Sequence, residues 1–302
     1  MNLSRKTLAL LFILILIILT VSSLLLRRQP EHDFAFSSYQ ELERLFSQRG
    51  YDSREWEQGL TQIPPLYLTR IPQHWTEEGA AQLSIREKKL LFFRWLTPLV
   101  LRSNLEIMAE QARLAREGGK DTAWLQAVAE KYKVPLPSRQ GRDGELLAAL
   151  KLRLAPIPPS LALAQAAEES GWGSSRFAVQ GNALYGQWTW SGTGMDSKER
   201  QQGKGKYQVA SFASPADSVA AYMLNLNTHP SYQEFRSQRA ALVDSGRPAG
   251  GIQLAQTLSR YSQRGQAYVE DLRLLITKNH LQRLDQARLS PDPPLYLVPL
   301  QP

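Results

Sequence analysis

The sequence has 302 residues, of which 43% are hydrophobic, so it can bury a sizeable core and is not a disordered chain. It contains no cysteine, which excludes disulfides and cysteine nucleophiles, and its four scattered histidines show no metal-ligand spacing. The formal net charge of +8 suits a polyanionic partner, but charge alone does not choose among nucleic acid, an acidic membrane surface and an anionic cell-wall polymer.

The N-terminal segment, residues 8–26, is an uncharged apolar run. As a helix it would measure about 28 Å, at about 1.5 Å per residue, which matches one bilayer crossing. A cleaved signal peptide would have a shorter apolar region and a small-residue cleavage site, neither of which is present. The sequence therefore predicts a single transmembrane helix within a membrane anchor, residues 1–28. The short N-terminal tail favours a main body outside the cytosol, although basic pairs flank the run on both sides.

Residues 29–83 are expected to form a linker and a membrane-proximal segment. A short helical pattern covers residues 39–51. Prolines on both sides of Leu66-Tyr67-Leu68 indicate an extended piece, because proline fixes its own backbone and disfavours helix before it.

The longest predicted helix begins behind a capping box formed by Ser84 and Glu87, and its apolar residues keep three- and four-residue spacing as far as Gly118. Pro98 is expected to kink or divide it. Helices over 122–132 and 144–154 follow, which completes an N-terminal helical part, residues 84–155.

The next helix, residues 161–169, lies within LALAQAAEESGWG and is expected to start from an N-cap at Ser160. It ends in two adjacent carboxylates, Glu168 and Glu169, followed by a glycine-rich break. A solvated last turn and a catalytic acid both explain such a pair. Helical periodicity does not decide between the two glutamates. Glu168 lies on the same helix face as Leu161, and Glu169 lies on the same face as Gln165.

Beyond this helix, frequent glycines and alternating residues between positions 181 and 211 predict a hairpin-like lobe. Ser214-Pro215-Ala216-Asp217 has the residues that open a helix. Further helices are expected near 232–243, 252–261 and 267–284. The tail, residues 290–302, is rich in proline, and its PPLYL repeats the one that begins at Pro64.

Aromatic residues are concentrated close to the two glutamates. Glycoside cleavage needs a carboxylic acid that stays protonated near neutral pH, and burial beside aromatic rings raises a carboxyl pKa in that way. Aromatic faces also stack on sugar rings, although an aromatic residue taken singly is more often part of the core. The nearby candidates are Trp172, Tyr185, Trp188 and Trp190.

The stretch AQAAEESGWGSSRFAVQGNALYGQW resembles the signature of the glucosaminidase domain of bacterial cell-wall hydrolases. Its context is similar to the Bax-type proteins of that family. The similarity extends to NLNTHPSYQEFR, to YSQRGQAYVEDL and upstream to PPLYLTRIP and REKKLLFFRWLTPLVLRSN, so it covers residues 64–289.

This resemblance implies an α+β, predominantly α, fold with a lysozyme-like glucosaminidase domain over 156–289 that includes a small β lobe. It implies a glycoside hydrolase of the endo-β-N-acetylglucosaminidase type, which cleaves the β-1,4 bond after N-acetylglucosamine in peptidoglycan without a cofactor or metal. The family's general acid is the glutamate directly before Ser-Gly-Trp, here Glu169, whereas Glu168 occupies a position that is commonly apolar.

The second catalytic group is left open between three mechanisms. An inverting enzyme needs a base about 6.5 to 9.5 Å from the acid, and a retaining enzyme a nucleophile at about 5 Å. Asp196 and Glu199 in the predicted lobe are the candidates, and both are also compatible with solvated loop charges. Alternatively, the acetamido group of the substrate attacks and a tyrosine hydroxyl positions it, for which Tyr261 and Tyr268 match the family pattern.

The remaining predictions concern the substrate and the location. The expected partners are the peptidoglycan glycan strand and, through residues 8–26, the lipid bilayer; no nucleic-acid module is recognisable. The expected location is the bacterial inner membrane, with the catalytic domain on its periplasmic or extracytoplasmic side. The substrate-binding candidates are Trp172, Asn182, Tyr185, Trp188, Trp190, Tyr222 and Tyr268.

Two alternative functions fit the same sequence. A lytic transglycosylase also uses one glutamate before serine in a lysozyme-like fold, and it releases an anhydro-sugar. A catalytically inactive wall-binding scaffold would keep the fold and lose the activity. The sequence makes no prediction of the oligomeric state.

Overall fold

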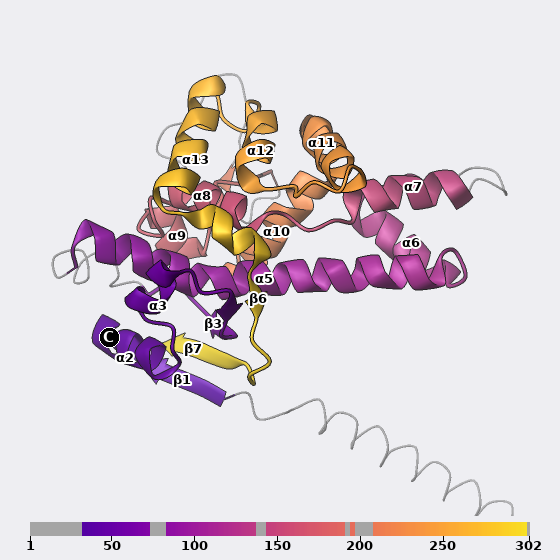
Figure 1. Cartoon of the computed structure of the whole chain (residues 1–302). Coiled ribbons are helices and arrows are strands. Elements are labelled where there is room, and N and C mark those ends of the chain that lie inside the picture. Colours follow the sequence, from indigo (N-terminus) through magenta and orange to yellow (C-terminus); the bar gives the residue numbers. More distant parts are fainter. Residues whose placement is uncertain (1–31, 73–82, 137–142, 191–193, 197–207, 301–302) are drawn as a thin grey trace, which may run out of the picture.

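The long helix α5 (Ile85–Glu117) runs across the middle of the molecule, with helices on one side and a small sheet with two short helices on the other (Figure 1). The computed structural model describes residues 32–72, 83–136, 143–190, 194–196 and 208–300. The helices that follow α5 are α6 (Thr122–Lys131), α7 (Asp143–Arg153), α8 (Pro159–Ser170), α9 (Arg176–Gly181), α10 (Pro215–Thr228), α11 (Gln233–Asp244), α12 (Gly251–Ala255) and α13 (Gln266–Lys278), with 3₁₀ helices η2 (Pro230–Tyr232), η3 (Gln256–Leu258) and η4 (Leu281–Gln286). The described residues therefore form a predominantly helical α+β fold.

The fold class predicted from the sequence needs one correction, which concerns the transmembrane helix. None of the helices in the described ranges combines the length and the apolar character that a membrane crossing requires. Residues 8–26, on which that prediction was made, lie outside the described residues.

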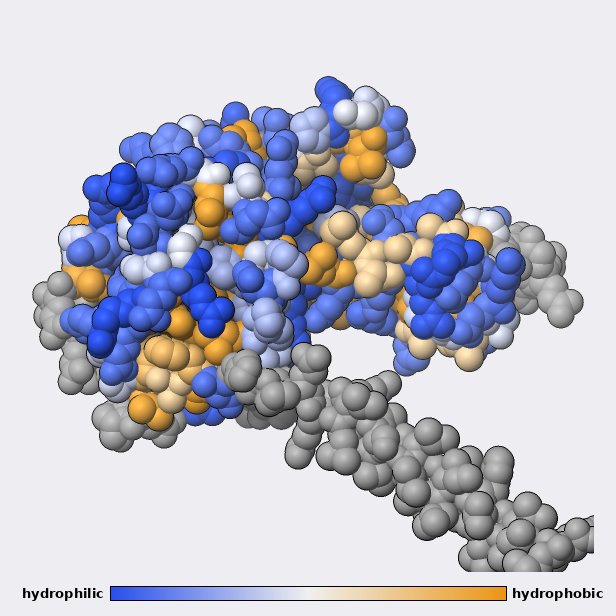
Figure 2. Space-filling model, turned by 60° about the horizontal axis from the view of Figure 1, so that its bottom comes forward, coloured by the Kyte–Doolittle hydropathy of each residue, from blue (hydrophilic) through white to orange (hydrophobic). Residues whose placement is uncertain are grey.

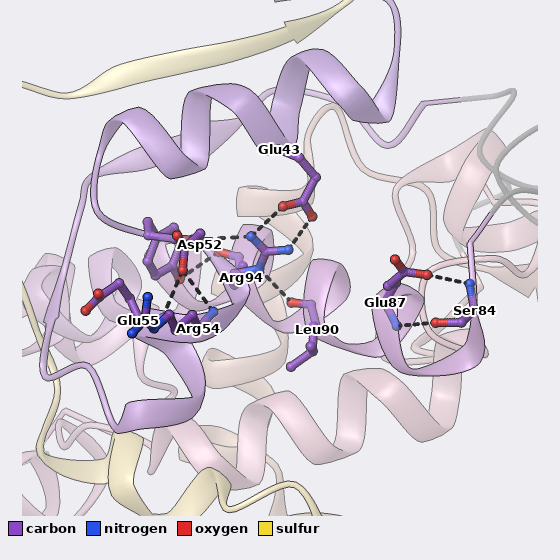
Figure 3. A network of polar contacts seen from close by, with 9 residues as sticks. Glu43, Asp52, Arg54, Glu55, Ser84, Glu87, Leu90 and Arg94 are labelled. Carbon is purple, nitrogen blue, oxygen red and sulfur yellow. Dashed lines mark hydrogen bonds and ion pairs between the residues drawn. The ribbon is translucent and has the colours of Figure 1, made fainter.

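Both ends of α5 follow their sequence signals. The Ser84 hydroxyl accepts a hydrogen bond from the Glu87 backbone N–H at 3.3 Å, and the Glu87 carboxylate accepts one from the Ser84 N–H at 2.7 Å (Figure 3). This is the predicted capping box. The helix ends at Glu117, where Gly118 takes a positive φ of 58°. The helices predicted over 122–132 and 144–154 are likewise confirmed, as α6 and α7.

Pro98 lies inside α5 without dividing it, so a division at this residue is wrong. Proline has no N–H to donate to the carbonyl of Arg94, four residues earlier. The Tyr51 hydroxyl donates to that carbonyl instead, at 2.9 Å. The fully buried Arg94 guanidinium donates to the carboxylate of Glu43 on α2 (Tyr39–Gln48), and to the Tyr51 carbonyl at 3.3 Å (Figure 3). Tyr51, which is distant in sequence, thus satisfies the backbone carbonyl that Pro98 leaves open.

Replacement Tyr51→Phe is expected to lower the free energy of unfolding by about 1–3 kcal/mol, because it leaves the buried Arg94 carbonyl without its hydroxyl donor. In a Pro98→Ala background the new backbone N–H can supply that carbonyl, so Tyr51→Phe should then cost less than half as much. Denaturant unfolding of the four proteins of this double-mutant cycle measures the difference. Equal costs in both backgrounds would contradict this explanation of the uninterrupted helix.

A parallel three-stranded sheet joins the two ends of the described chain. Its strands are β1 (His32–Phe36), β7 (Leu295–Pro299) and β3 (Leu66–Leu68), in the order β1-β7-β3. A second parallel pair joins β2 (Gln62–Ile63) to β6 (Arg288–Leu289). The segment expected to be a linker therefore contributes strands over its described part, as well as α2 and α3 (Ser53–Gln58).

The two PPLYL stretches pair with each other in this sheet. Leu66 lies opposite Leu295, Tyr67 opposite Tyr296, and so on along both strands. Their leucines are buried, which explains why the same apolar pattern occurs at two distant positions. Figure 2 shows this side of the molecule, where hydrophilic side chains cover most of the surface and apolar side chains occur in separate groups.

Helix α8 lies at the centre of the helical layer and packs against α5, α12, α13 and η4. It starts at Pro159, and Ser160 is not its N-cap as predicted. The Ser160 N–H and hydroxyl both donate to the Asp285 carboxylate on η4, each at 2.9 Å. A carboxylate distant in sequence thus satisfies the start of α8 and fixes the helix to η4.

The described part of the predicted lobe contains a small antiparallel pair. β4 (Trp188–Thr189) lies beside β5 (Gln208–Val209), and Met195 forms a bridge to Val209. After it, Ser214 caps α10 through a hydrogen bond from the Asp217 N–H at 3.2 Å, as predicted. The strand β4 begins two residues after Gly186, which lies close to the Glu169 side chain at the end of α8.

Candidate active site

The two glutamates at the end of α8 have different environments. Glu168 forms an ion pair with Arg264, with 2.6 Å between Oε1 and Nη1, and its side chain is 30% exposed. Glu169 is partly buried, and burial raises the pKa of its carboxyl to about 7 from the usual 4.5. A hydrogen bond from the Tyr268 hydroxyl opposes this rise, and the neighbouring charge of Glu168 adds to it. The Glu169 carboxyl therefore keeps a substantial protonated fraction near neutral pH.

A chain of buried hydrogen bonds leads to Glu169 from the core. The Tyr222 hydroxyl donates to the Gln165 side-chain oxygen at 2.8 Å, and the Gln165 amide nitrogen donates to the Tyr268 oxygen at 3.0 Å. The Tyr268 hydroxyl proton is thereby left to donate to the Glu169 carboxyl. Gln165 and Glu169 are four residues apart on α8, so they lie on the same face of that helix.

Tyrosine rings form the surroundings of this carboxyl. Tyr185 stacks on Tyr222 with ring centroids 3.8 Å apart, and Tyr261 stacks on Tyr268 at 5.6 Å. Tyr232 lies against Tyr261 at 5.8 Å. Burial is the main cause of the raised pKa of all five tyrosines, and the charge of Glu169 also raises the pKa of every one except Tyr185. These phenols are therefore neutral, with hydroxyl protons available for hydrogen bonding.

The loop GNALYG closes this site from the other side. Gly186 has a φ of 60°, and a Cβ added there would lie 3.1 Å from Oε2 of Glu169. Glycine allows both the left-handed backbone and the close approach to the carboxyl. The Tyr261 hydroxyl donates to the carbonyl of Tyr185 at 3.0 Å, which ties the loop to the tyrosine cluster.

The turn after α8 explains the sequence Ser-Gly-Trp-Gly. Gly171, Trp172 and Gly173 all have a positive φ, so the chain reverses sharply just after Glu169. The Trp172 ring packs edge-on against Phe92 and Phe93 of α5, with centroids 5.8 and 5.3 Å away. The structure thus gives the Trp172 ring packing contacts on α5, and its predicted role in binding sugar stays a prediction.

Asn182 and the exposed tryptophans have contrasting positions. The Asn182 side chain accepts a hydrogen bond from the Ile71 N–H at 3.1 Å and donates to the carbonyls of Phe212 and Ala213, so it holds three segments together. Trp188 and Trp190 on the lobe are 38% and 67% exposed, with ring centroids 6.4 Å apart. This exposed pair is compatible with stacking on sugar rings, whereas Asn182 is fully engaged with the backbone.

The candidates for a second carboxylate remain untested. Asp196 is exposed, and its Oδ1 accepts a hydrogen bond from the Gln208 side chain at 3.3 Å. Glu199 lies outside the described residues. Among the carboxylates that the structure describes, Glu168 is the one whose charge raises the pKa of Glu169, and Glu168 forms an ion pair with Arg264.

Of the predicted residues, the structure brings Tyr185, Tyr222, Tyr261 and Tyr268 together around Glu169. It adds Gln165 and Tyr232, which the sequence analysis did not name as site residues. The signal for Gln165 was present, because it precedes Glu169 by one helical repeat of four. Tyr232 carries no comparable local signal, because its position depends on packing against Tyr261.

Comparison with known proteins gives a consistent result. The family model described as mannosyl-glycoprotein endo-beta-N-acetylglucosaminidase, named Glucosaminidase, matches residues 148–281. The protein bax of Escherichia coli (strain K12) is 30% identical over 210 residues, which cover 67% of this chain and 73% of that protein. No solved structure gives a significant match, so the lysozyme-like architecture stays a prediction. The matched range contains α8 and the tyrosine cluster.

Proposed function

Because the chain belongs to the glucosaminidase-domain family as a Bax-type member, we propose that it cleaves the β-1,4 glycosidic bond after N-acetylglucosamine in peptidoglycan, with Glu169 as general acid. A peptidoglycan-related hydrolase is the coarser function that the family indicates. The bond cleaved and the role of Glu169 are the parts that we add. Since peptidoglycan lies outside the cytoplasm, the proposal also implies an extracytoplasmic site of action.

One observation carries this proposal, namely the Glu169 carboxyl whose pKa is raised to about 7 by burial. Cleavage of a glycosidic bond requires a proton for the leaving oxygen, and an acid with a pKa near the working pH combines availability with donor strength. The close approach of Gly186 and the surrounding tyrosines limit access of water to this carboxyl. Glu168, by contrast, is engaged with Arg264 and lacks that environment.

The buried hydrogen bonds around Glu169 support a second role, the orientation of its carboxyl group. Tyr268 donates to one side of the carboxyl, which leaves the acidic proton for the substrate. Gln165 fixes the direction of that donation, because its amide nitrogen occupies the acceptor position of the Tyr268 oxygen. In this proposal Tyr268 contacts the acid, and Gln165 acts through Tyr268 as a positioning residue.

Digestion of purified peptidoglycan by the full chain, followed by mass spectrometry of the products, tests the proposed function. We expect fragments with N-acetylglucosamine at the reducing end. Products that end in 1,6-anhydro-muramic acid would identify a lytic transglycosylase instead. Complete absence of digestion by folded protein would favour the wall-binding scaffold and overturn the proposed activity.

The dependence of activity on pH provides a further prediction. We expect kcat/KM to fall as pH rises through about 7, because Glu169 then loses the proton that it donates. The hydrogen bond from Tyr268 lowers the pKa of Glu169, so Tyr268→Phe should raise that pKa and move the alkaline limb upward by roughly one pH unit.

Tyr132→Phe is the matched control for this shift. In the wild type the Tyr132 hydroxyl also donates to a glutamate, Glu110, at 2.8 Å, but both residues belong to the α5–α6 region and not to the tyrosine cluster around Glu169. Its removal should leave the alkaline limb unchanged. A limb that stays in place in Tyr268→Phe, or that moves in both variants, would contradict the proposed effect of Tyr268 on Glu169.

A further inference from the structure

A cavity lies outside the tyrosine cluster, between the segment before the matched domain and the end of that domain. Its volume is about 660 Å³, and residues from α3, the first turns of α5, the end of α13 and η4 line it. None of the five tyrosines around Glu169 lines this cavity. The family match covers residues 148–281, so α3 and α5 contribute walls that the matched domain does not contain.

The lining of this cavity is strongly cationic. Four basic side chains line it, against a single carboxylate, that of Glu57; they are Arg86, Lys89, Lys278 and Arg283. Arg86 already forms an ion pair with Glu57. Within the described ranges, neither Lys89 nor Lys278 nor Arg283 forms an ion pair with a carboxylate. Lys89 and Lys278 therefore have no carboxylate partner in that part of the chain, whereas the charge of Glu57 also acts on Arg283.

Arg283 is held against α3 by two contacts. Its guanidinium lies over the Trp56 ring, 5.6 Å from the centroid, and one Nη donates to the Glu57 backbone carbonyl at 3.0 Å. Its Nε is buried without a hydrogen-bond partner. Burial also lowers the pKa of this guanidinium, which reflects the cost of removing a cation from water. A bound anion would compensate that cost and supply acceptors to the basic groups.

We propose that this cavity binds an anionic group, a carboxylate or a phosphate, carried by the cell-wall polymer. The proposal rests on the proposed function, because it treats the cavity as a second contact for the same polymer. A polymer held at two places has a higher effective concentration at the acid than one held only by the glycan. The carboxylates of wall peptides and the phosphates of anionic wall polymers share the chemistry that such a site recognises.

Lys278→Glu tests the site with little risk to folding, because Lys278 is exposed in the last turn of α13. Lys151→Glu is the matched control. Lys151 is also an exposed lysine in the last turn of a helix, α7, and its replacement changes the net charge by the same amount. Both changes are made in full-length Glu169→Gln protein, so that binding is measured without hydrolysis. The probes are a peptidoglycan fragment with free carboxylates, the same fragment with amidated carboxylates, a neutral chito-oligosaccharide and inorganic phosphate.

We expect Lys278→Glu to weaken binding of an anionic probe about tenfold, while the neutral oligosaccharide and the Lys151→Glu control show no change. A loss confined to the free-carboxylate fragment identifies a peptide carboxylate as the ligand, and a loss confined to phosphate identifies a phosphate. Equal affinities of the two variants for every anionic probe would overturn the site. This outcome is separate from failure of the proposed function, which is read from digestion of peptidoglycan by the wild-type chain.

Discussion

Replacement Glu169→Gln is expected to reduce hydrolysis of peptidoglycan by about 10²- to 10⁴-fold, the contribution that a positioned general acid makes. Glutamine preserves the size of the side chain and its hydrogen bond from Tyr268, but it cannot donate a proton to the leaving oxygen. The measurement is kcat/KM on purified peptidoglycan, followed by release of reducing ends. A variant that keeps more than about a tenth of the wild-type rate would exclude Glu169 as the acid.

Glu168→Gln is the control, because it changes the adjacent residue in the same way. It removes the ion pair with Arg264, which is partly exposed and contributes little to stability. Its charge contributes to the raised pKa of Glu169, so its removal should move the alkaline limb slightly downward. We expect activity at the optimal pH to stay within a few-fold of the wild type.

The stability of Glu169→Gln separates a catalytic loss from unfolding. The pKa of Glu169 is raised to about 7 in the folded protein from the usual 4.5, so its ionisation destabilises the fold as pH rises through this interval. At pH 8 the variant should therefore be more stable than the wild type, by up to about 3 kcal/mol for a shift of this size. At pH 4 the difference should disappear. An inactive variant that is also less stable at pH 8 would contradict this account.

The choice of Glu169 over Glu168 as the proposed acid could be made from the sequence because the information is local. The motif places Glu169 directly before Ser-Gly-Trp, and helical spacing puts it on the line of Gln165. Periodicity alone did not decide between Glu168 and Glu169, and the structure shows how their surroundings differ. The face with Gln165 is buried against Tyr222 and Tyr268, whereas Glu168 lies beside Arg264, which follows α12 and η3 along the chain.

Features that depend on distant partners could not be predicted in the same way. Pro98 indicates a break when α5 is considered alone, but the Tyr51 hydroxyl supplies the unpaired carbonyl. Ser160 has the residue type of an N-cap, yet its hydroxyl donates to Asp285, 125 residues later. The two PPLYL stretches could be seen in the sequence, but only the fold shows that they are neighbouring strands. In each case the local pattern does not identify the distant partner, and for Pro98 and Ser160 that partner changes the outcome.

Replacement Gly251→Ala is expected to lower the free energy of unfolding by about 3 kcal/mol or more, the upper end of the cost of overpacking. An added Cβ would lie 2.2 Å from the Ser160 hydroxyl oxygen and 2.8 Å from the Leu161 backbone nitrogen. The second contact is with backbone at the start of α8, so it cannot be relieved by rotation of a side chain. The displacement would also disturb the Ser160 contacts with Asp285 that hold this helix start.

Gly144→Ala is the matched control, because Gly144 lies in the first turn of α7 and an added Cβ there meets nothing within 4 Å. It should be neutral or stabilise the protein by up to about 1 kcal/mol, since alanine favours helix more than glycine. Denaturant unfolding measures both variants, and kcat/KM of the folded fraction shows whether the start of α8 also positions Glu169 at its other end. A cost below about 1 kcal/mol for Gly251→Ala would mean that α8 and α12 separate easily, and the acid would then not be held by this contact.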